Sequence, residues 1–483
     1  MPSSDRKDRP DTRSAASERM LKDAIVMRDV AGGTDQMRDR STVYLTQHPA
    51  ETAGDYRVRL NNAVLSPNAV ASTVSALAGM VHRQNIAIGE DVPEPIVELL
   101  ANIDNRGTHL DVFMRDAFAD ALEAGHVGIL VDAPLIPEAV TLTRVQEAAL
   151  GIRPFWTTYA KESIISWRFD RVNGRQVLEQ LVLHEPTIEP DGAFGEQVVD
   201  RWRVLRRVGL PESPTIEWEL WEDIDDNPTI QAMGTLTNVD EIPFVVIYGG
   251  SKTAELESDP PLLDLAHVNI AHYQVHADLR QSLLKACCPI LTLMGVDSDE
   301  PIKSGPNITL TLPEGADAKY VEHAGRAHAD AENRLKDYKH DMSTMGVGML
   351  FPEVRNPETA TARRMDKSEQ DSALATAARS EQDAIDQLLA ITARMLNLED
   401  GGTVTVNRDF DMLTLDAQEL LAWFGAEAQG IVSLETVWAI LQEGGKLPDG
   451  FDPEVEKDRI EASVPPPAPA PVAIPVPVGE VEE

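Results

Sequence analysis

The stretch from Asp259 to Met345 constrains the fold most, because its pattern predicts a long helix, two short strands and a second long helix. The first helix begins after Ser258, whose side chain can cap free backbone N–H groups, and the prolines that follow suit a first helical turn. Pro289 cannot continue this helix, so it should end near Cys287. Gly346 should end the second helix.

The residues between the two helices predict a small β element at the tip of a helical pair. Pro289–Met294 is apolar and short, and Asn307–Leu312 alternates apolar residues with threonines. We therefore expect these two segments to be strands.

Each predicted helix carries one narrow apolar stripe, with apolar residues three or four positions apart. The second stripe has the spacing of helices that pack lengthwise on others. Neither stripe is rich enough in large apolar side chains to form the centre of a globular core. We therefore expect both helices to pack against copies of the same chain, and the alternative is an ordinary helical hairpin inside a monomer. The residues expected to pack between subunits are Leu263, Ile270, Tyr273, Leu335, Tyr338 and Met342.

The net charge of −37 is the strongest global signal in this chain of 483 residues. A surface so acidic repels phosphate, which excludes tight, sequence-independent binding of nucleic acid over most of the molecule. Any contact with DNA should therefore be local and weak. The length allows two to four domains with their own cores.

The sequence gives no sign of a membrane segment or of a disulfide framework. No apolar run approaches the eighteen or so residues that span a bilayer, and the first residues lack an apolar signal region. We expect a protein that is made and kept in the cytoplasm. The two cysteines, Cys287 and Cys288, are adjacent, and we interpret them as packing residues.

Upstream of the long helices, the chain alternates between helical and strand patterns. Leu110–Ala124 has a strongly helical pattern and precedes an apolar strand at Val127–Val131. These patterns predict an α+β fold with a mostly antiparallel sheet backed by helices. The further predicted strands are Phe155–Tyr159, Val177–His184, Val198–Leu205, Ile216–Trp221 and Phe244–Tyr248.

Composition and helix signals divide the chain into nine predicted segments. Downstream, Asn356-Pro357-Glu358 is a helix start with a cap, a proline and an acid in the first turn. The tail of repeated proline cannot bury a core. The predicted segments are a flexible N-terminal segment (1–39), a broad domain (40–258), a first long helix (259–287), the β tip (288–323), a second long helix (324–345), a glycine-bounded loop (346–356), a very long helix with a strand (357–411), a helical C-terminal domain (412–463) and a disordered tail (464–483).

The chain carries none of the common catalytic motifs. Gly444-Gly445-Lys446 is followed by Leu447, so the phosphate-binding loop of nucleotide hydrolases is missing. The patterns G-x-G-x-x-G, G-x-S-x-G and H-E-x-x-H are absent as well. We therefore expect a protein that is not an enzyme and needs no cofactor.

Two groups of residues could hold a metal ion. His272 and His276 lie one helical turn apart, which is ligand spacing for zinc, and Asp264 or His267 lies a turn or so away. No third ligand shares their face, so we favour polar packing between helices over a metal site.

Acidic clusters are the second group, because converging carboxylates could hold the divalent cations of a nuclease. With 80 acidic residues in the chain, such clusters arise by chance, and we interpret them as solvated surface. The clusters are Asp297, Asp299 and Glu300, and Asp409 with Asp411.

Basic residues gather locally on the second long helix. Arg334, Lys336 and Lys339, with Arg355 further on, stand out against the acidic background and could touch a phosphate backbone weakly. The alternative is that they form ion pairs with nearby acids, which are Asp330, Glu332, Asp337 and Glu353.

The order of these parts resembles that of the portal proteins of tailed bacteriophages, whose subunits divide into wing, stem, clip, second stem, tunnel loop, wing helix and crown. The resemblance covers roughly residues 40–460. It rests on the order of the segments and on several short sequence phrases, and no single motif establishes it. The phrases that are similar to one branch of that family are Leu262-Leu263-Asp264 through Leu283, Cys288-Pro289-Ile290-Leu291, Asn356-Pro357-Glu358-Thr359-Ala360-Thr361-Ala362, Ser433-Leu434-Glu435-Thr436-Val437-Trp438 and Gly445-Lys446-Leu447-Pro448.

The resemblance implies a ring, typically of twelve subunits, at one vertex of the capsid, after assembly in the host cytoplasm. It implies that double-stranded DNA passes transiently through the channel and that the partners are the terminase large subunit, an adaptor or head-completion protein, and the major capsid and scaffold proteins. It implies no membrane, metal or cofactor. The DNA-facing residues under this resemblance are Gly346, Gly348, Met349 and Arg355 of the tunnel loop, and Lys336 and Lys339 of the stem.

Two alternatives from other classes stay open. One is a metal-dependent nuclease, in which case Asp297 and Asp299 together would be needed for cleavage of DNA with Mg²⁺. The other is a scaffold or minor head protein that binds capsid proteins without forming a channel.

Overall fold

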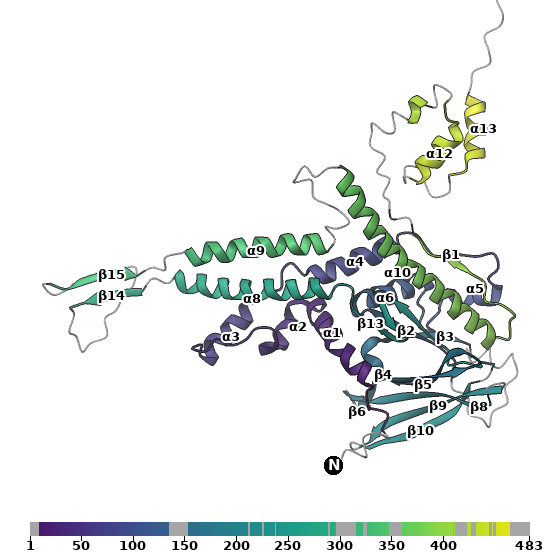
Figure 1. Cartoon of the computed structure of the whole chain (residues 1–483), viewed down its shortest axis with the longest axis horizontal. Helices are drawn as coiled ribbons and strands as arrows, with labels where there is room; N and C mark the ends of the chain where they lie inside the picture. The colour runs from purple at the N-terminus through teal and green to yellow at the C-terminus, as the bar shows by residue number, and fades with distance from the viewer. Residues whose placement is uncertain are drawn as a thin grey trace, which may run out of the picture. The chain divides into compact units, whose positions relative to one another are not determined.

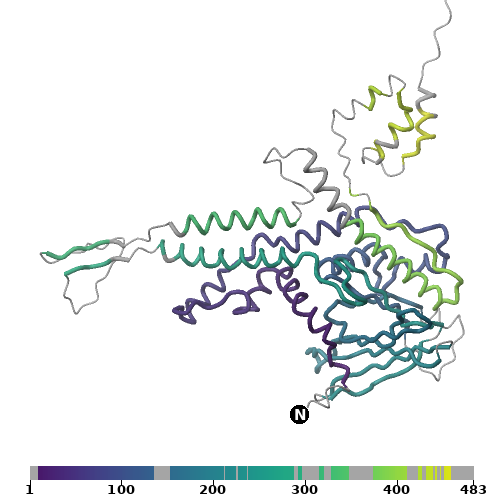
Figure 2. The backbone as a smooth tube through the Cα atoms, in the orientation of Figure 1, coloured from purple at the N-terminus to yellow at the C-terminus, as the bar shows by residue number. Residues whose placement is uncertain are grey.

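A computed structural model describes most of the chain and divides it into two compact units, Met1–Asp409 and Phe410–Glu483 (Figures 1 and 2). The described residues are 9–134, 153–210, 213–224, 227–236, 238–287, 290–295, 315–321, 326–346, 360–408, 410, 423–426, 431–443, 447 and 451–463. No helix among these residues is long and apolar enough to cross a membrane.

The first unit is built on two antiparallel sheets, which confirms the predicted α+β class. The larger sheet has the order β10-β9-β8-β5-β4 and the smaller has the order β11-β2-β3. The predicted strand at Val198–Leu205 divides in two, because the chain leaves one ladder at Val199 and enters another at Arg201. The strands are β2 (His126–Asp132), β3 (Phe155–Ala160), β4 (Ile164–Val172), β5 (Arg175–His184), β8 (Arg201–Leu210), β9 (Ser213–Ile224), β10 (Asn227–Leu236) and β11 (Phe244–Tyr248).

The main core lies between these two sheets. Alternate residues of the larger sheet, including Leu181, Leu205 and Ile216, are buried and pack with Leu130 and Tyr159 of the smaller sheet. The period of two along each strand is what places these side chains on one face. The opposite face of the larger sheet carries a second cluster, which is Ile165, Val182, Trp202 and Val204.

Two helices pack on the smaller sheet, α6 (Leu110–Ala124) and α10 (Ala360–Met395) (Figure 1). The indole Nε1 of Trp156 donates a hydrogen bond to the hydroxyl of Thr392 on α10 at 3.0 Å. In β2, a Cβ at Gly128 would lie 2.0 Å from the ring of Phe244, so any larger residue there would require that ring to move. The helix α6 spans the predicted residues.

Shorter elements complete the first unit. The ribbon β6–β7 connects β5 to β8, and β1 pairs with β16. The remaining elements are α1 (Ala15–Ala31), α2 (Gly33–Asp39), η2 (Ser41–Val43), α3 (Ala53–Asn62), α4 (Ala69–Val81), β1 (Ala87–Ile88), α5 (Glu94–Leu100), η3 (Lys161–Ser163), β6 (Thr187–Asp191), β7 (Gly195–Val199), β12 (Lys252–Ala254), β13 (Glu257–Ser258) and β16 (Val404–Thr405).

The N-terminal helix α1 corrects the expectation of a flexible segment at residues 1–39. Ser14 caps α1, since its hydroxyl accepts a hydrogen bond from the Ser17 amide. Met27 and Val30 are fully buried, and α1 packs against α6 and α8. The sequence of α1 did not reveal that the helix packs in the core, because its composition is polar and only one of its faces is apolar. Residues 1–8 lie outside the described part of the chain.

Replacing Met27 with alanine should lower the free energy of unfolding by about 2–5 kcal/mol, because the deletion leaves a cavity under a fully buried side chain. Urea unfolding followed by circular dichroism measures the change. The control is Lys22→Ala on the exposed face of α1, which should change stability by no more than about 0.5 kcal/mol. Equal, small effects at both positions would contradict a packed N-terminal helix.

The second unit contains α12 (Leu434–Glu443) and α13 (Pro453–Ser463). Ser433 caps α12, since its hydroxyl accepts a hydrogen bond from the Thr436 amide at 3.2 Å. The ring of Trp438 meets that of Phe451 edge-on at 5.6 Å. The predicted tail at 464–483 lies outside the described residues.

Candidate functional site: the α8–α9 hairpin and the polar pocket

Two long helices run side by side between the rest of the first unit and a β ribbon (Figures 1 and 2). They are α8 (Leu263–Ala286) and α9 (Arg326–Met345), close to the predicted bounds. Near the ribbon, the Ser282 hydroxyl and His328 Nε2 form a hydrogen bond of 2.8 Å. We call this pair with its ribbon the α8–α9 hairpin.

The ribbon pairs β14 (Ile290–Met294) with β15 (Asp317–Val321) in antiparallel register. The first strand was predicted. The second was not, because the sequence signal lay at Asn307–Leu312, which is outside the described residues. The small sheet consists of these two strands, so each has one side without a partner strand among the described elements.

The α8 helix is covered by the chain itself as far as Arg280, which corrects the expectation that this chain supplies no neighbours for the helix. The helices α1, α3 and α4 pack against it. Asn269, which is fully buried, accepts from the Ala69 amide and donates to the Pro67 carbonyl, so it joins α8 to the start of α4. The segment predicted to be flexible, residues 1–39, supplies part of this cover through α1.

A buried arginine ties α3 to α8. Arg59 Nη1 lies 2.8 Å from Asp278 on α8, and its Nη2 lies 2.8 Å from Glu51. Burial lowers the pKa of the Arg59 guanidinium, but the two carboxylates outweigh burial and raise it above its ordinary value. Arg59 therefore stays charged and holds α3 on the hairpin.

The structure places the predicted subunit-packing residues in two groups. Tyr273, Leu335 and Met342 are buried within the single chain, so the packing that the structure describes for them is internal. The half-buried members of the set are Leu263, Ile270 and Tyr338.

Several large apolar side chains of the hairpin are exposed and were not among the predicted packing residues. Leu283 and Leu284 lie near the end of α8, and half of Leu284 is open to solvent. Met294 on β14 and Met345 at the end of α9 are exposed as well. Leu284 belongs to the apolar stripe of α8, so the sequence did contain a signal for it. The cover that α1, α3 and α4 give to α8 does not extend to these leucines.

The predicted DNA-facing residues are only partly described. Lys336 and Lys339 are exposed on α9, and Arg334 stacks over the Tyr338 ring at 4.4 Å. Gly346 is buried at the end of α9. The other predicted residues, Gly348, Met349 and Arg355, lie outside the described residues.

His272 and His276 stack on α8 with nearly parallel rings 6.0 Å apart. Neither ring nitrogen of His272, a buried residue, has a hydrogen-bond partner. The described residues contain no group of three or more side chains that could hold a metal ion. Burial, with smaller contributions from His276 and Lys339, lowers the pKa of His272 to about 4. His272 is therefore neutral at pH 7.

Acidification should destabilise the α8–α9 hairpin through His272. The pKa of His272 is lower in the folded chain than in the unfolded chain, so the unfolded chain takes up a proton first as the pH falls. The free energy of unfolding therefore keeps its full value above pH 6.5 and decreases by about 1–3 kcal/mol as the pH drops toward 4. Urea unfolding at several pH values should show that acid lowers the free energy of unfolding less in His272→Phe than in the unsubstituted protein. The control His267→Phe, at an exposed position of α8, should keep the loss of the unsubstituted protein.

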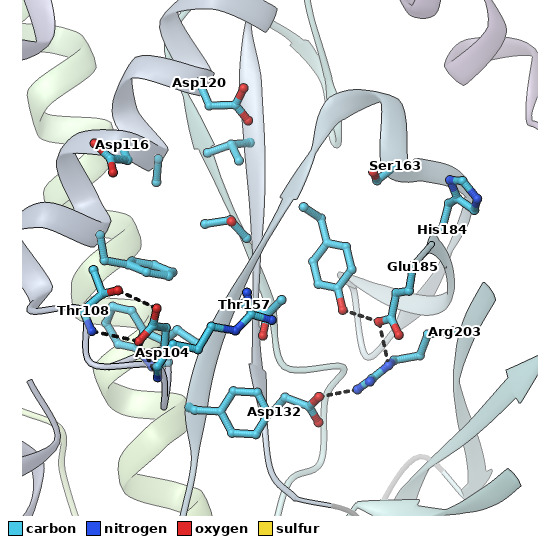
Figure 3. Close-up of a pocket in the computed structure, with 18 of the residues that line it drawn as sticks. Asp104, Thr108, Asp116, Asp120, Asp132, Thr157, Ser163, His184, Glu185 and Arg203 are labelled. Atoms are coloured by element: carbon cyan, nitrogen blue, oxygen red, sulfur yellow. Dashed lines mark hydrogen bonds and ion pairs between the residues drawn. The ribbon is translucent and has the colours of Figure 1, made fainter. Parts of the chain in front are cut away.

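A polar pocket of about 740 Å³ lies between the loop before α6, the smaller sheet and the end of β5 (Figure 3). On one wall Arg203 bridges two carboxylates, since its Nε lies 2.8 Å from Glu185 and its Nη1 contacts Asp132. The Tyr159 hydroxyl donates to Glu185. On the opposite wall Asp104 accepts from the hydroxyl and the amide of Thr108.

The charges of this pocket satisfy one another. Burial lowers the pKa of Arg203, but Glu185, Tyr159 and Asp132 outweigh it and raise the pKa above the ordinary value. Burial and then Glu185 raise the pKa of Tyr159. Because each of these groups has a protein partner, we interpret the network as a set of contacts that holds the two sheets together.

A second polar cluster, Lys161, His126 and Ser258, also joins elements. Lys161 donates to the carbonyls of Ala124 and Ser258 at 2.9 and 2.7 Å, and burial lowers its pKa to about 8. His126 Nδ1 lies 2.8 Å from the Ser258 hydroxyl. All three side chains are buried. The acids considered for a nuclease, Asp297, Asp299, Glu300, Asp409 and Asp411, lie outside the described residues.

Comparisons with known proteins give one family and several structures. Residues 261–396, which include α8, α9 and α10, match a family described as a domain of unknown function (DUF4055). No curated protein matches the chain. Similar solved structures include a chain from the neck of an empty GTA particle, with a TM-score of 0.42, 13% identity, and coverage of 82% of this chain and 94% of that chain. A chain from the virion of a native gene transfer agent (GTA) particle has a TM-score of 0.41, 13% identity, and coverage of 84% and 98%.

Proposed function

We propose that this protein is a portal protein of a tailed-phage-like particle, in which copies of the chain form a ring around a DNA channel. The α8–α9 hairpin is the stem of the subunit, with the β14–β15 ribbon as the clip. The helix α10 is the wing helix and the second unit is the crown.

The observation that carries this proposal is the exposed apolar surface of the hairpin beyond the cover of α1, α3 and α4. Leu283 and Leu284 are exposed near the end of a helix that is well packed up to that point. Exposed apolar groups on a long helix are typical of surfaces that another protein covers. In a ring each hairpin lies beside the hairpin of the next subunit, which would bury these leucines.

The ribbon supports the same arrangement. A two-stranded ribbon is marginally stable by itself, and both of its outer edges lack a partner strand among the described elements. Strand edges are protected when a closed ring brings neighbouring copies together. The ribbon is therefore better explained in a ring than in a monomer.

The charge of the chain suits a channel through which DNA moves. A ring of subunits that each carry −37 repels the DNA backbone and keeps it from binding tightly. Lys336 and Lys339 on α9 then provide weak, local contacts with phosphate.

As a portal, the protein would act without catalysis and would occupy one vertex of the capsid, after assembly in the host cytoplasm. Its partners would be the terminase large subunit, an adaptor or head-completion protein, and the major capsid and scaffold proteins. The mutually paired polar groups around Arg203 agree with a structural role.

Native mass spectrometry and negative-stain imaging of the purified full chain test the proposal. The expected result is a closed ring with a central hole and a mass that is an integral multiple of the 52.9 kDa subunit. A protein that stays monomeric across micromolar concentrations, with no rings in the images, would contradict the proposal.

A further inference from the structure

The β6–β7 ribbon connects β5 to β8 and pairs with no third strand among the described elements. Its two strands pack mainly on each other, and residues 190–198 are all exposed. Gly192 begins its turn with a φ of +75°, and a Cβ at Gly195 would lie 2.4 Å from the carbonyl oxygen of Asp191. The two glycines therefore allow a tight turn, and Phe194 lies between them.

Large apolar side chains of this ribbon are open to solvent. Ile188 lies directly opposite Val198 in the register, so both side chains are on one face of the ribbon. They are 64% and 69% exposed, and Phe194 in the turn is fully exposed. Exposed apolar groups that lie close together are typical of surfaces that another molecule covers, and aromatic residues are enriched in such interfaces. A two-stranded ribbon is marginally stable by itself, so a partner would also stabilise it.

The charges on the ribbon have a single sign. Residues 187–200 include four acids, Glu189, Asp191, Glu196 and Asp200, and neither lysine nor arginine. The first and last of these acids pair with side chains at the base of the ribbon. The other two, which lie near the turn, form no ion pair among the described residues. The outer part of the ribbon therefore combines exposed apolar side chains with two carboxylates that no cation of this chain neutralises.

We propose that the β6–β7 ribbon docks into an apolar recess bordered by lysine or arginine side chains on a different protein. Charge identifies this occupant. A basic border would pair with the carboxylates of Asp191 and Glu196 while the recess receives Phe194. A second copy of the chain, which carries −37, and a DNA backbone would each meet charge of their own sign at the ribbon. The inference does not depend on the proposed ring, because it concerns a partner of the single subunit.

Three probe peptides of equal length test this inference on the full chain. They alternate lysine with leucine, lysine with serine, and glutamate with leucine. Fluorescence anisotropy measures how tightly each probe binds, and hydrogen exchange measures where it binds. The lysine–leucine probe should slow the exchange of the β6 and β7 amides. It should also bind about tenfold more tightly than either other probe, because only this probe offers both apolar groups and cations.

Substitutions within the ribbon separate its apolar contribution from its charge. The triple variant Ile188→Thr, Phe194→Ser, Val198→Thr should bind the lysine–leucine probe about tenfold or more weakly, because it removes the exposed apolar groups. Its control makes similar changes at three other exposed apolar positions and should bind like the unsubstituted protein; the changes are Val43→Thr, Leu210→Ser and Met233→Thr.

The charge variant Asp191→Asn, Glu196→Gln should weaken binding of the same probe about tenfold, because it removes both free carboxylates. Its control, Asp39→Asn with Glu98→Gln, removes two other exposed acids and should bind like the unsubstituted protein. Equal binding by the charge variant and its control would show that the acids of the ribbon do not choose the partner, which contradicts the inference.

Every other outcome also decides the question. The inference is wrong if the lysine–leucine probe leaves the β6 and β7 amides unprotected, if the triple variant binds as tightly as its control, or if another probe binds equally well. A triple variant that no longer self-associates in analytical ultracentrifugation would assign the ribbon to a second copy and overturn the inference. The exchange measurement uses unsubstituted protein, so it is decisive even if a variant misfolds. Probe binding at the ribbon without ring formation would contradict the proposed function alone.

Discussion

Replacing both Leu283 and Leu284 with glutamate is expected to abolish the ring while leaving the subunit folded. Both side chains are exposed in the single chain, so their replacement removes little internal packing. Because each leucine is already about half-buried in the single chain, its burial in the assembly contributes roughly half of the about 1.5–3 kcal/mol of a fully exposed leucine. Losing both at every subunit contact weakens that contact by about 1.5–3 kcal/mol, which is a factor of about 10 to 10² in its dissociation constant. Native mass spectrometry should then detect monomers at concentrations where the unsubstituted protein forms rings.

The control for this prediction is a pair of glutamates placed elsewhere on exposed apolar positions. Val58→Glu on α3 with Val112→Glu on α6 adds the same negative charge to the chain, and both valines are exposed. If the control also dissociates, general repulsion explains the effect. Rings that persist in the leucine variant would exclude the hairpin from the subunit contact.

The elements that sequence reasoning located well are those whose signals are local. The helix at Leu110–Ala124 has a strong 3.6-residue pattern and a glycine after it, and the structure gives the same bounds. The continuous apolar run Phe244–Tyr248, which forms β11, is an equally local signal. Such signals need no knowledge of the partner on which an element packs.

Other parts depend on contacts between distant residues and could not be predicted. The role of α1 is an example, since its composition is polar and its burial follows only from the helices that surround it. The cover that it gives to α8 changed which residues of the hairpin are available to a neighbour. The sequence identified the hairpin but not the exposed leucines as its open surface.

The network around Arg203 was missed for the same reason. Asp132, Glu185 and Arg203 come from the ends of β2 and β5 and from β8, and only the strand order brings them together. In sequence, each looks like one more charge in an acidic chain. The pairing of β5 with β8 places His184 opposite Trp202, and this register sets Arg203 beside Glu185.

Replacing Arg203 with methionine is expected to produce the largest loss of stability among single substitutions in this network. The change keeps much of the side-chain volume but leaves the carboxylates of Asp132 and Glu185 without their shared cation. Both carboxylates are largely buried, with side chains 9% and 19% exposed. Removing one partner of a buried ion pair costs about 3–5 kcal/mol. Urea unfolding at pH 7 should measure a loss in this range.

Two comparisons separate loss of charge from loss of packing. Arg206→Met alters the same strand, but the side chain of Arg206 is 38% exposed beside Glu219, so the expected loss is below about 1 kcal/mol. Adding Glu185→Gln to Arg203→Met should recover part of the stability, because it removes one orphaned charge. The loss in Arg203→Met should also shrink as the pH falls from 7 to 4, since an unpaired buried carboxylate has a raised pKa and becomes neutral. A loss that is constant with pH and unaffected by Glu185→Gln would mean that packing, and not charge, joins the two sheets at this point.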